Sequence, residues 1–220
     1  MKSNVANVRR IAILIGLALA LLVPLISLIP GGKELMQIPG LGPSLGREAF
    51  LWALGAVVVL YVLIVERRPL SSIGWNGISW KTFAIGAAGA VAVIAFAGAV
   101  IAIALPLLHL QQNAEALKQM VALPYWLRFS IVLRAGIVEE ILFRGYGIER
   151  LRELIGNRYV AGAITLAVFS FAHLSHWGLA QLVVAGAAGL VLTVLYLWRR
   201  DLGTNMVAHF LVDGSQLLLS

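Results

Sequence analysis

The chain contains no cysteine and few charged residues: 12% of its 220 residues are charged and 60% are hydrophobic. The absence of cysteine excludes disulfides, a thiolate nucleophile and Cys-ligated metals. A soluble domain carries roughly a quarter charged residues, so this chain has too few to cover a water-facing surface. Lipid is therefore the expected solvent for most of it.

The basic residues outnumber the acidic ones and give a formal net charge of +7. A strongly basic chain can indicate binding to nucleic acid. Here, however, the basic residues lie in short gaps between apolar runs, where the positive-inside rule expects them. We therefore expect a lipid bilayer as the surroundings and no nucleic acid as a partner.

Seven apolar segments are each close to the ~20 residues that a helix needs to cross the hydrocarbon core. Their ranges are 11–29, 48–65, 82–108, 126–145, 159–175, 178–198 and 203–219. The pattern predicts an all-α, polytopic transmembrane helix bundle with about seven spans. We expect three accessory spans in residues 1–124 and a catalytic core of four spans in residues 125–220. The last segment is short and moderately polar, so it needs neighbours to shield it.

The first apolar run follows a basic start and is longer than the core of a usual signal peptide, with no small-x-small cleavage site after it. We expect a retained transmembrane helix. Basic residues gather at the N-terminus and after the second, fourth and sixth segments. This bias predicts a cytoplasmic N-terminus and an extracytoplasmic C-terminus, in a prokaryotic plasma membrane.

Ionisable side chains inside lipid are costly, and each is a functional candidate by default. The centres of the first three segments contain essentially none. The later segments contain a concentrated polar set: Arg134, Glu139, Glu140, Arg144, His173, His176, Asn205, His209 and Asp213. The sequence therefore predicts that the chemistry of the protein lies in its C-terminal half.

Helical spacing separates the two adjacent glutamates. Glu140 and Arg144 are four residues apart and can pair on one helix face, which indicates a structural role for Glu140. Glu139 is rotated by about 100° from Glu140 on an α-helix. It is then the freer carboxylate and suits a general base or acid. Arg134 either snorkels outward or pairs with a site carboxylate.

A hairpin near Gly156 predicts which groups meet. Glu139 precedes this glycine by 17 residues and His173 follows it by 17, so antiparallel helices place both at a similar depth. His209 and Asp213, four residues apart, share a face of the last segment. Glu139, His173 and His209 are thus expected to converge on one water or one metal ion. A lone His173 near a helix end would instead be an interfacial histidine.

Three spaced motifs resemble a known family. They are EExxxR at Glu139, Glu140 and Arg144, FxxxH at Phe169 and His173, and HxxxN/D at His209 and Asp213. In this order they are similar to the motifs of the CPBP family, the CAAX-protease and bacteriocin-processing membrane proteins, also called Abi. The resemblance covers roughly residues 125–217.

The resemblance implies peptide-bond hydrolysis inside the membrane. By carry-over, Glu139 and His173 activate the attacking water, while His209 and Asp213 hold the substrate carbonyl and its developing oxyanion. The eukaryotic and archaeal prenyl proteases of this family usually have Asn in place of Asp213. Because an ionised carboxylate repels an oxyanion, Asp213 must be protonated, orient His209, or help to bind a metal.

The residues leave the cofactor open between none and Zn. Glu139, His173 and His209 are the candidate zinc ligands, but a metal-free glutamate mechanism is compatible with the same residues and is the one we favour. The expected partner is a membrane-associated peptide or protein. The alternatives are a catalytically silent immunity or scaffold protein and a proton-coupled transporter. The transporter is disfavoured because its polar residues would normally recur in both halves of the chain.

Overall fold

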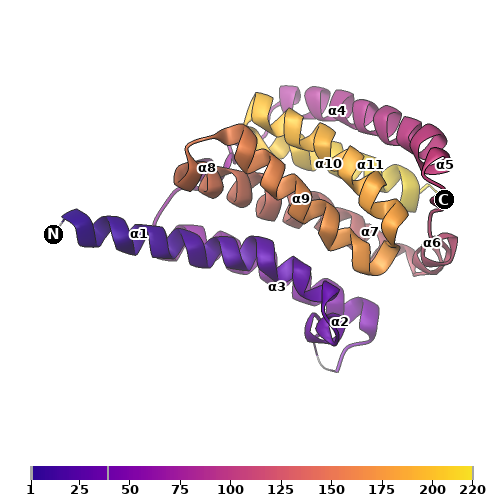
Figure 1. The fold of residues 1–220 in the computed structure, drawn as a ribbon, viewed down its shortest axis with the longest axis horizontal. Coiled ribbons are helices and arrows are strands. Elements are labelled where there is room, and N and C mark those ends of the chain that lie inside the picture. Colours follow the sequence, from indigo (N-terminus) through magenta and orange to yellow (C-terminus); the bar gives the residue numbers. More distant parts are fainter. Residues whose placement is uncertain (1, 39, 220) are drawn as a thin grey trace.

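The computed structural model describes residues 2–38 and 40–219, without the side chains of residues 2–6 and 176. In this part of the chain, helices and their connections make up the whole fold and no β-strand is present, which confirms the all-α class (Figure 1). The helices are α1 Lys2–Leu17, η1 Ala18–Leu22, η2 Val23–Leu28, α2 Gly32–Leu35, α3 Pro43–Leu60, η3 Tyr61–Val65, η4 Leu70–Ile73, α4 Trp80–Ala99, η5 Val100–Ala104, α5 Leu105–Leu107, α6 Ala114–Val121, α7 Tyr125–Arg134, η6 Ala135–Ile148, α8 Glu149–Ile155, α9 Arg158–Trp177, α10 Leu179–Arg199 and α11 Leu202–Leu217.

Five continuous helical stretches are long and apolar enough to cross a membrane, so the protein is an integral membrane protein. They are Asn7–Leu28, Pro43–Val65, Trp80–Leu107, Arg158–Ser175 and Leu179–Arg199. A sixth span is obtained when Ala114–Val121 and Tyr125–Ile155, which meet at a bend of 115°, are taken together. The predicted seventh segment forms α11, a helix of 16 residues. About seven spans is therefore roughly consistent with the structure.

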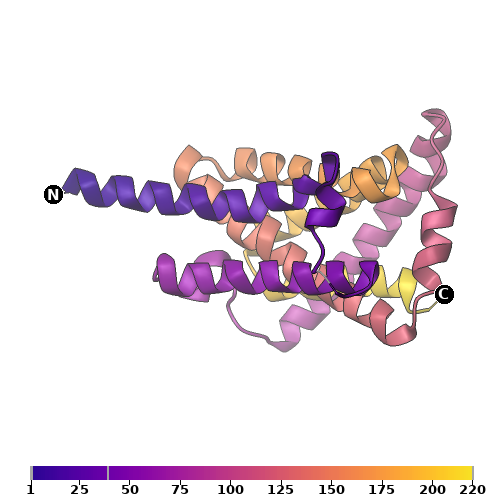
Figure 2. The ribbon, with the colours of Figure 1, turned by 90° about the horizontal axis from the view of Figure 1, so that it is seen from below.

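The π-helix η6 lies at the centre of the bundle. It contacts α3, α9 and α11, while α4 packs against α10 and α11 on another side. Figures 1 and 2 show α1 and α3 running along the bundle on the side away from α4. Apolar side chains of α3 and η3, such as Val58 and Val62, pack with the buried aromatic rings Phe143 and Tyr146 of η6. The short, polar α11 is thus shielded by its neighbours, as its composition required.

Small residues allow two of these helix contacts to be close. A Cβ added at Gly86 would lie 2.7 Å from side-chain atoms of Val207, and one added at Gly189 would lie 2.9 Å from Phe169. Small residues at such positions let membrane helices approach without a steric barrier. Gly86 and Gly189 therefore set the distances between α4 and α11 and between α10 and α9.

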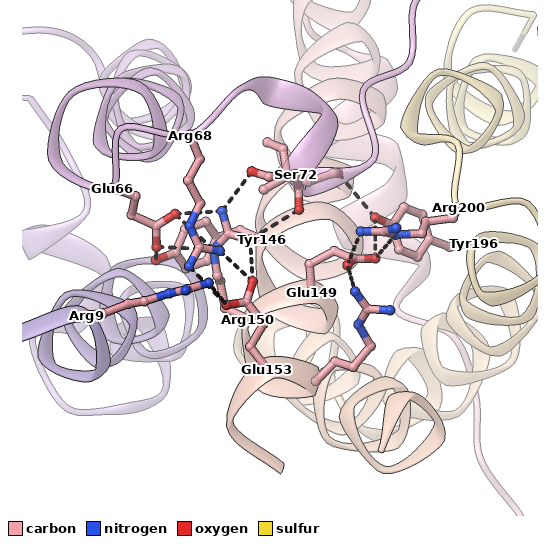
Figure 3. Close-up of polar contacts among 12 residues, drawn as sticks. Arg9, Glu66, Arg68, Ser72, Tyr146, Glu149, Arg150, Glu153, Tyr196 and Arg200 are labelled. Carbon is pink, nitrogen blue, oxygen red and sulfur yellow. Dashed lines mark hydrogen bonds and ion pairs between the residues drawn. The ribbon is translucent and has the colours of Figure 1, made fainter. Parts of the chain in front are cut away.

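A network of ion pairs joins the N-terminal helices to α8 at the end of the bundle where the N-terminus lies (Figures 1 and 3). We call Arg9, Glu66, Arg68, Arg150 and Glu153 the ion network. The guanidinium of Arg150 is fully buried and donates to Glu66 at 2.6 Å. Arg68 and Arg9 both donate to Glu153, at 2.5 and 3.2 Å. The hydrogen bonds to Glu153 raise the pKa of Arg68, which keeps this guanidinium charged.

We predict that Arg150→Gln lowers the free energy of unfolding by about 3–5 kcal/mol, because the buried carboxylate of Glu66 loses its counter-charge. Arg9→Gln is the matched control, since Arg9 is an exposed member of the same network and such pairs contribute about 0–1 kcal/mol. Unfolding would be followed by circular dichroism in mixed micelles at increasing SDS. Equal losses for both variants would contradict the prediction.

Candidate functional site

Three helices bring the predicted site residues together near the middle of the bundle. The π-helix η6 carries Glu139, Glu140 and Arg144. Helix α9 carries the FxxxH pair, and α11 carries the last His and Asp. The expected hairpin is present, because α8 ends at a Gly156 with a φ of 80° and α9 begins at Arg158. Glu139 and His173, on the two sides of this turn, therefore lie at a similar depth, as the sequence predicted.

Glu140 is a fully buried carboxylate with three side-chain donors. Arg144 donates to Oε1 at 2.8 Å, which confirms the expected pair, and Nδ1 of His209 lies 2.8 Å from the same oxygen. The amide of Asn205 donates to Oε2 at 3.1 Å. Because a carboxylate only accepts hydrogen bonds, the proton in the His209 contact is on Nδ1. Glu140 thus determines the orientation of the His209 ring. The other ring nitrogen, Nε2, faces away from Glu140 and towards Asp213.

Glu139 is the more exposed of the two adjacent carboxylates, at 18% against 0% for Glu140, and it has a partner of its own. Its Oε1 accepts a hydrogen bond from Nη1 of Arg134 at 2.6 Å, and Arg134 also pairs with Glu48 of α3 at 3.2 Å. The contact with Arg134 fits the local helix, because the chain from Ala135 is a π-helix, in which residues five apart bond along the axis. Arg134 and Glu139 have this spacing. Of the two alternatives for Arg134, pairing with a site carboxylate is the correct one.

The second oxygen of Glu139 faces His173. Its Oε2 lies 3.9 Å from Nε2 of His173, which is too long for a direct hydrogen bond but suits a bridging water. Nδ1 of His173 lies 2.8 Å from the carbonyl oxygen of Phe169. Since a carbonyl only accepts, Nδ1 is the donor in this contact, and in the neutral ring Nε2 is an acceptor. Glu139 also interacts electrostatically with His209.

The ring of Phe169 is the surface on which these groups pack. The guanidinium carbon of Arg144 lies 4.3 Å from its centroid, within the range of a cation–π contact. The rings of His173 and His209 lie 4.6 and 6.3 Å from it, centroid to centroid. The bare backbone of Gly189 leaves the room that this ring occupies. Phe169 therefore holds both histidines and the arginine in one arrangement.

The site is sealed on one side and open on the other. The side chains of Glu140 and Arg144 are at most 1% exposed, whereas those of Glu139, His173 and Asp213 are 18%, 23% and 31% exposed. Asp213 Oδ2 lies 3.5 Å from Nε2 of His209, as their spacing on α11 predicted. Glu139, His173 and Asp213 are thus each partly accessible from outside the bundle. The side chain of His176 lies outside the described residues.

A catalytic zinc ion is bound by three protein ligands and a water. Within residues 2–38 and 40–219, no group of three or more His, Asp or Glu side chains has the arrangement to hold a metal ion. Arg134 engages Oε1 of Glu139 and Glu140 engages Nδ1 of His209, so one atom of each of these candidate ligands is already paired. As arranged here, the candidate ligands Glu139, His173 and His209 do not fit a zinc site.

Two residues of the site were not assigned a role from the sequence. Glu48 supplies the buried carboxylate that pairs with Arg134, and Asn205 donates to Glu140 and to the carbonyl oxygen of Leu192. The signal for Asn205 was its position one helical turn before His209. Glu48 stands beside Arg47 at the start of an apolar segment, which resembles an ordinary interfacial pair. Nothing in the sequence links Glu48 to Arg134, which lies 86 residues away.

The comparisons with known proteins agree with the motifs. Residues 120–215 match a family model described as Rce1-like, "Type II CAAX prenyl endopeptidase Rce1-like". No curated protein and no solved structure matches the chain. The matched region contains all three motifs and the helices from α7 to α10, with most of α11. It supports an intramembrane endopeptidase acting on a membrane-associated protein or peptide, and it confirms the resemblance of this region to the CPBP family.

Proposed function

We propose that the chain is an intramembrane endopeptidase that hydrolyses a peptide bond of a membrane-associated peptide or protein with a water activated by Glu139 and His173. The observation that carries the proposal is the 3.9 Å gap between Oε2 of Glu139 and Nε2 of His173. A water in this gap would interact with two acceptors at once. Such a pair can take up a proton as the water oxygen attacks a carbonyl carbon.

The two oxygens of Glu139 support separate tasks. Oε1 is held by Arg134, which fixes the plane of the carboxylate. Oε2 faces the water position and takes the proton when the new C–O bond forms. The C–N bond then breaks, and the proton passes from Glu139 or His173 to the departing amine. The chain of Glu48, Arg134 and Glu139 thus makes α3 a positioning element for the proposed base.

His209 is proposed to stabilise the oxyanion of the tetrahedral intermediate. Nδ1 is occupied by Glu140, so Nε2 is the nitrogen that can reach a substrate oxygen. To donate from Nε2 as well, the ring must carry two protons. The carboxylates of Glu140 and Asp213, one at each nitrogen, compensate that positive charge. In this role Asp213 orients His209, which is one of the three alternatives that the Asp in place of Asn left open.

We predict that Glu139→Gln lowers the rate of peptide cleavage at least ~100-fold, because the amide cannot accept the proton of the water. The full-length protein in proteoliposomes would be incubated with a library of single-span and amphipathic peptides, and products would be identified by mass spectrometry. Glu115→Gln is the matched control, because Glu115 is an exposed carboxylate of α6 outside the site. It should leave the rate unchanged.

The same assay separates the proposed enzyme from a silent scaffold. A scaffold or immunity protein would capture its membrane partner equally well with Glu139→Gln and would show no cleavage with either form. Robust cleavage by the double variant Glu139→Ala, His173→Ala would contradict the assignment of the site. Circular dichroism of each variant establishes that the loss of activity is not a loss of fold.

For Asp213 we predict a graded response. Asp213→Asn retains an oxygen that accepts a hydrogen bond from His209, and kcat should stay within about tenfold of the parent. Asp213→Leu removes the acceptor and should lower kcat by about 10–100-fold, the range for groups that orient a functional side chain. KM should change little in both variants. Equal inactivity of the Asn and Leu variants would show that a carboxylate is required at this position.

The proposed mechanism is independent of a metal. The purified protein is expected to contain clearly less than one zinc per chain by elemental analysis, and cleavage should persist after dialysis against 1,10-phenanthroline. Near-stoichiometric zinc, removed by the chelator together with activity and restored with it, would replace this mechanism by a metal-dependent one. The zinc content is measured without an activity assay, so this result is informative even before a substrate is identified.

A further inference from the structure

A crevice opens between α1 and the segment that follows η3, beside the ion network. Its volume is about 650 Å³, within the range of roughly 300–1,000 Å³ that is typical of small-molecule sites. The wall formed by α1 carries Val8, Arg9, Ala12 and Ile13, and the facing wall is formed by residues 65–68. Tyr61 donates to the carbonyl oxygen of Ala12 at 2.8 Å, which joins the two walls. The crevice is distinct from the candidate active site.

The wall of this crevice carries one arginine, Arg67, that forms no ion pair within the part of the chain that the structure describes. Arg67 is exposed, and among the described residues its side chain has no hydrogen-bond or ion-pair partner. Its backbone has a φ of 53°, a left-handed conformation that residues other than glycine seldom adopt. Strained backbone of this kind clusters at ligand-binding positions. The unusual turn places Arg67 on the wall of the crevice, beside Arg68.

The charges around the crevice do not balance. Three arginines line it, and the buried Arg150 lies behind them in the ion network. Two carboxylates, Glu66 and Glu153, pair with three of these guanidiniums, those of Arg9, Arg68 and Arg150, and Glu66 also accepts from Tyr146 (Figure 3). Two positive charges therefore remain without a carboxylate of their own. An anion that enters the crevice would meet an excess of positive charge in a partly enclosed space.

The surface that adjoins the crevice is apolar and exposed. Val8 of α1 and Val65 of η3 line the crevice and are more than half exposed, and Ile15, two turns after Val8 on the same face of α1, is half exposed. A soluble anion such as inorganic phosphate gains nothing from these side chains. A molecule with a phosphate at one end and hydrocarbon chains at the other would match both parts, because the arginines lie where the apolar helix faces end.

We propose that this crevice binds the headgroup phosphate of an anionic phospholipid, with Arg67 and Arg68 contacting the phosphate and the acyl chains lying along the exposed faces of α1 and η3. Basic pockets between membrane helices are suited to such headgroups. The ligand would sit against Arg9 and Arg68, the two arginines that tie the N-terminal helices to α8 through Glu153. The proposal does not depend on the proposed peptidase activity.

The test is a titration of the detergent-purified full-length protein with phosphatidylglycerol and, separately, phosphatidylcholine of the same acyl chains, followed by native mass spectrometry. Phosphatidylglycerol should bind at least about fivefold more tightly than phosphatidylcholine. Arg67→Gln should weaken phosphatidylglycerol binding about fivefold, the effect of one basic residue at an anionic headgroup. It should leave phosphatidylcholine binding unchanged, and Arg67→Lys should retain the preference.

Arg158→Gln is the matched control, because Arg158 is an exposed arginine at the start of α9 and does not line the crevice. Phosphatidylglycerol binding should be unchanged in this variant. The proposal is overturned if Arg158→Gln and Arg67→Gln weaken binding equally, since the effect would then be general surface charge. It is also overturned if the two lipids bind alike, or if glycerol phosphate at the same concentration displaces phosphatidylglycerol, which would indicate a site for a soluble phosphate.

Discussion

A carboxylate that has no access to water needs hydrogen-bond donors around it, and Glu140 has three of them from two helices. Its own helix supplies Arg144, and α11 supplies Asn205 and His209. Leaving such a group unpaired in an apolar bundle would cost several kcal/mol. The requirement therefore couples helix packing to the geometry of the site. The helices that satisfy Glu140 are the same helices that present His209 to the open side, where Glu139 and His173 lie.

The order and identity of these elements were accessible from the sequence. The lengths of the apolar runs indicated the helices, and the concentration of ionisable residues in one half indicated the region of the site. The i, i+4 spacings predicted the Glu140–Arg144 and His209–Asp213 contacts. The equal distances from Gly156 predicted that Glu139 and His173 would face each other. Each of these inferences depends only on local geometry and on the cost of charge in lipid.

The environment of Glu139 was not accessible in the same way, for two physical reasons. A π-helix changes which residues share a face, and composition gives little warning that hydrogen bonds will shift from i+4 to i+5 along the chain. In addition, the pair between Arg134 and Glu48 depends on how α3 docks against η6. Neither the segment around Glu48 nor the segment around Arg134 contains a motif for that contact. The partner of Arg134 stayed open in the sequence, because the prediction assumed α-helical geometry and a C-terminal half that supplies all its own partners.

The contact between Arg134 and Glu48 has a consequence for what counts as the functional unit. The region that resembles the endopeptidase family begins at residue 120, and all three motifs lie inside it. Arg134, which lies in this region, nonetheless pairs with Glu48 of α3, a helix that the family model does not cover. A helix that precedes residue 120 thus completes the electrostatics of the part that matches the family model. A family boundary drawn on motifs alone separates Glu48 from Arg134 and Glu139, although the three side chains form one chain of ion pairs.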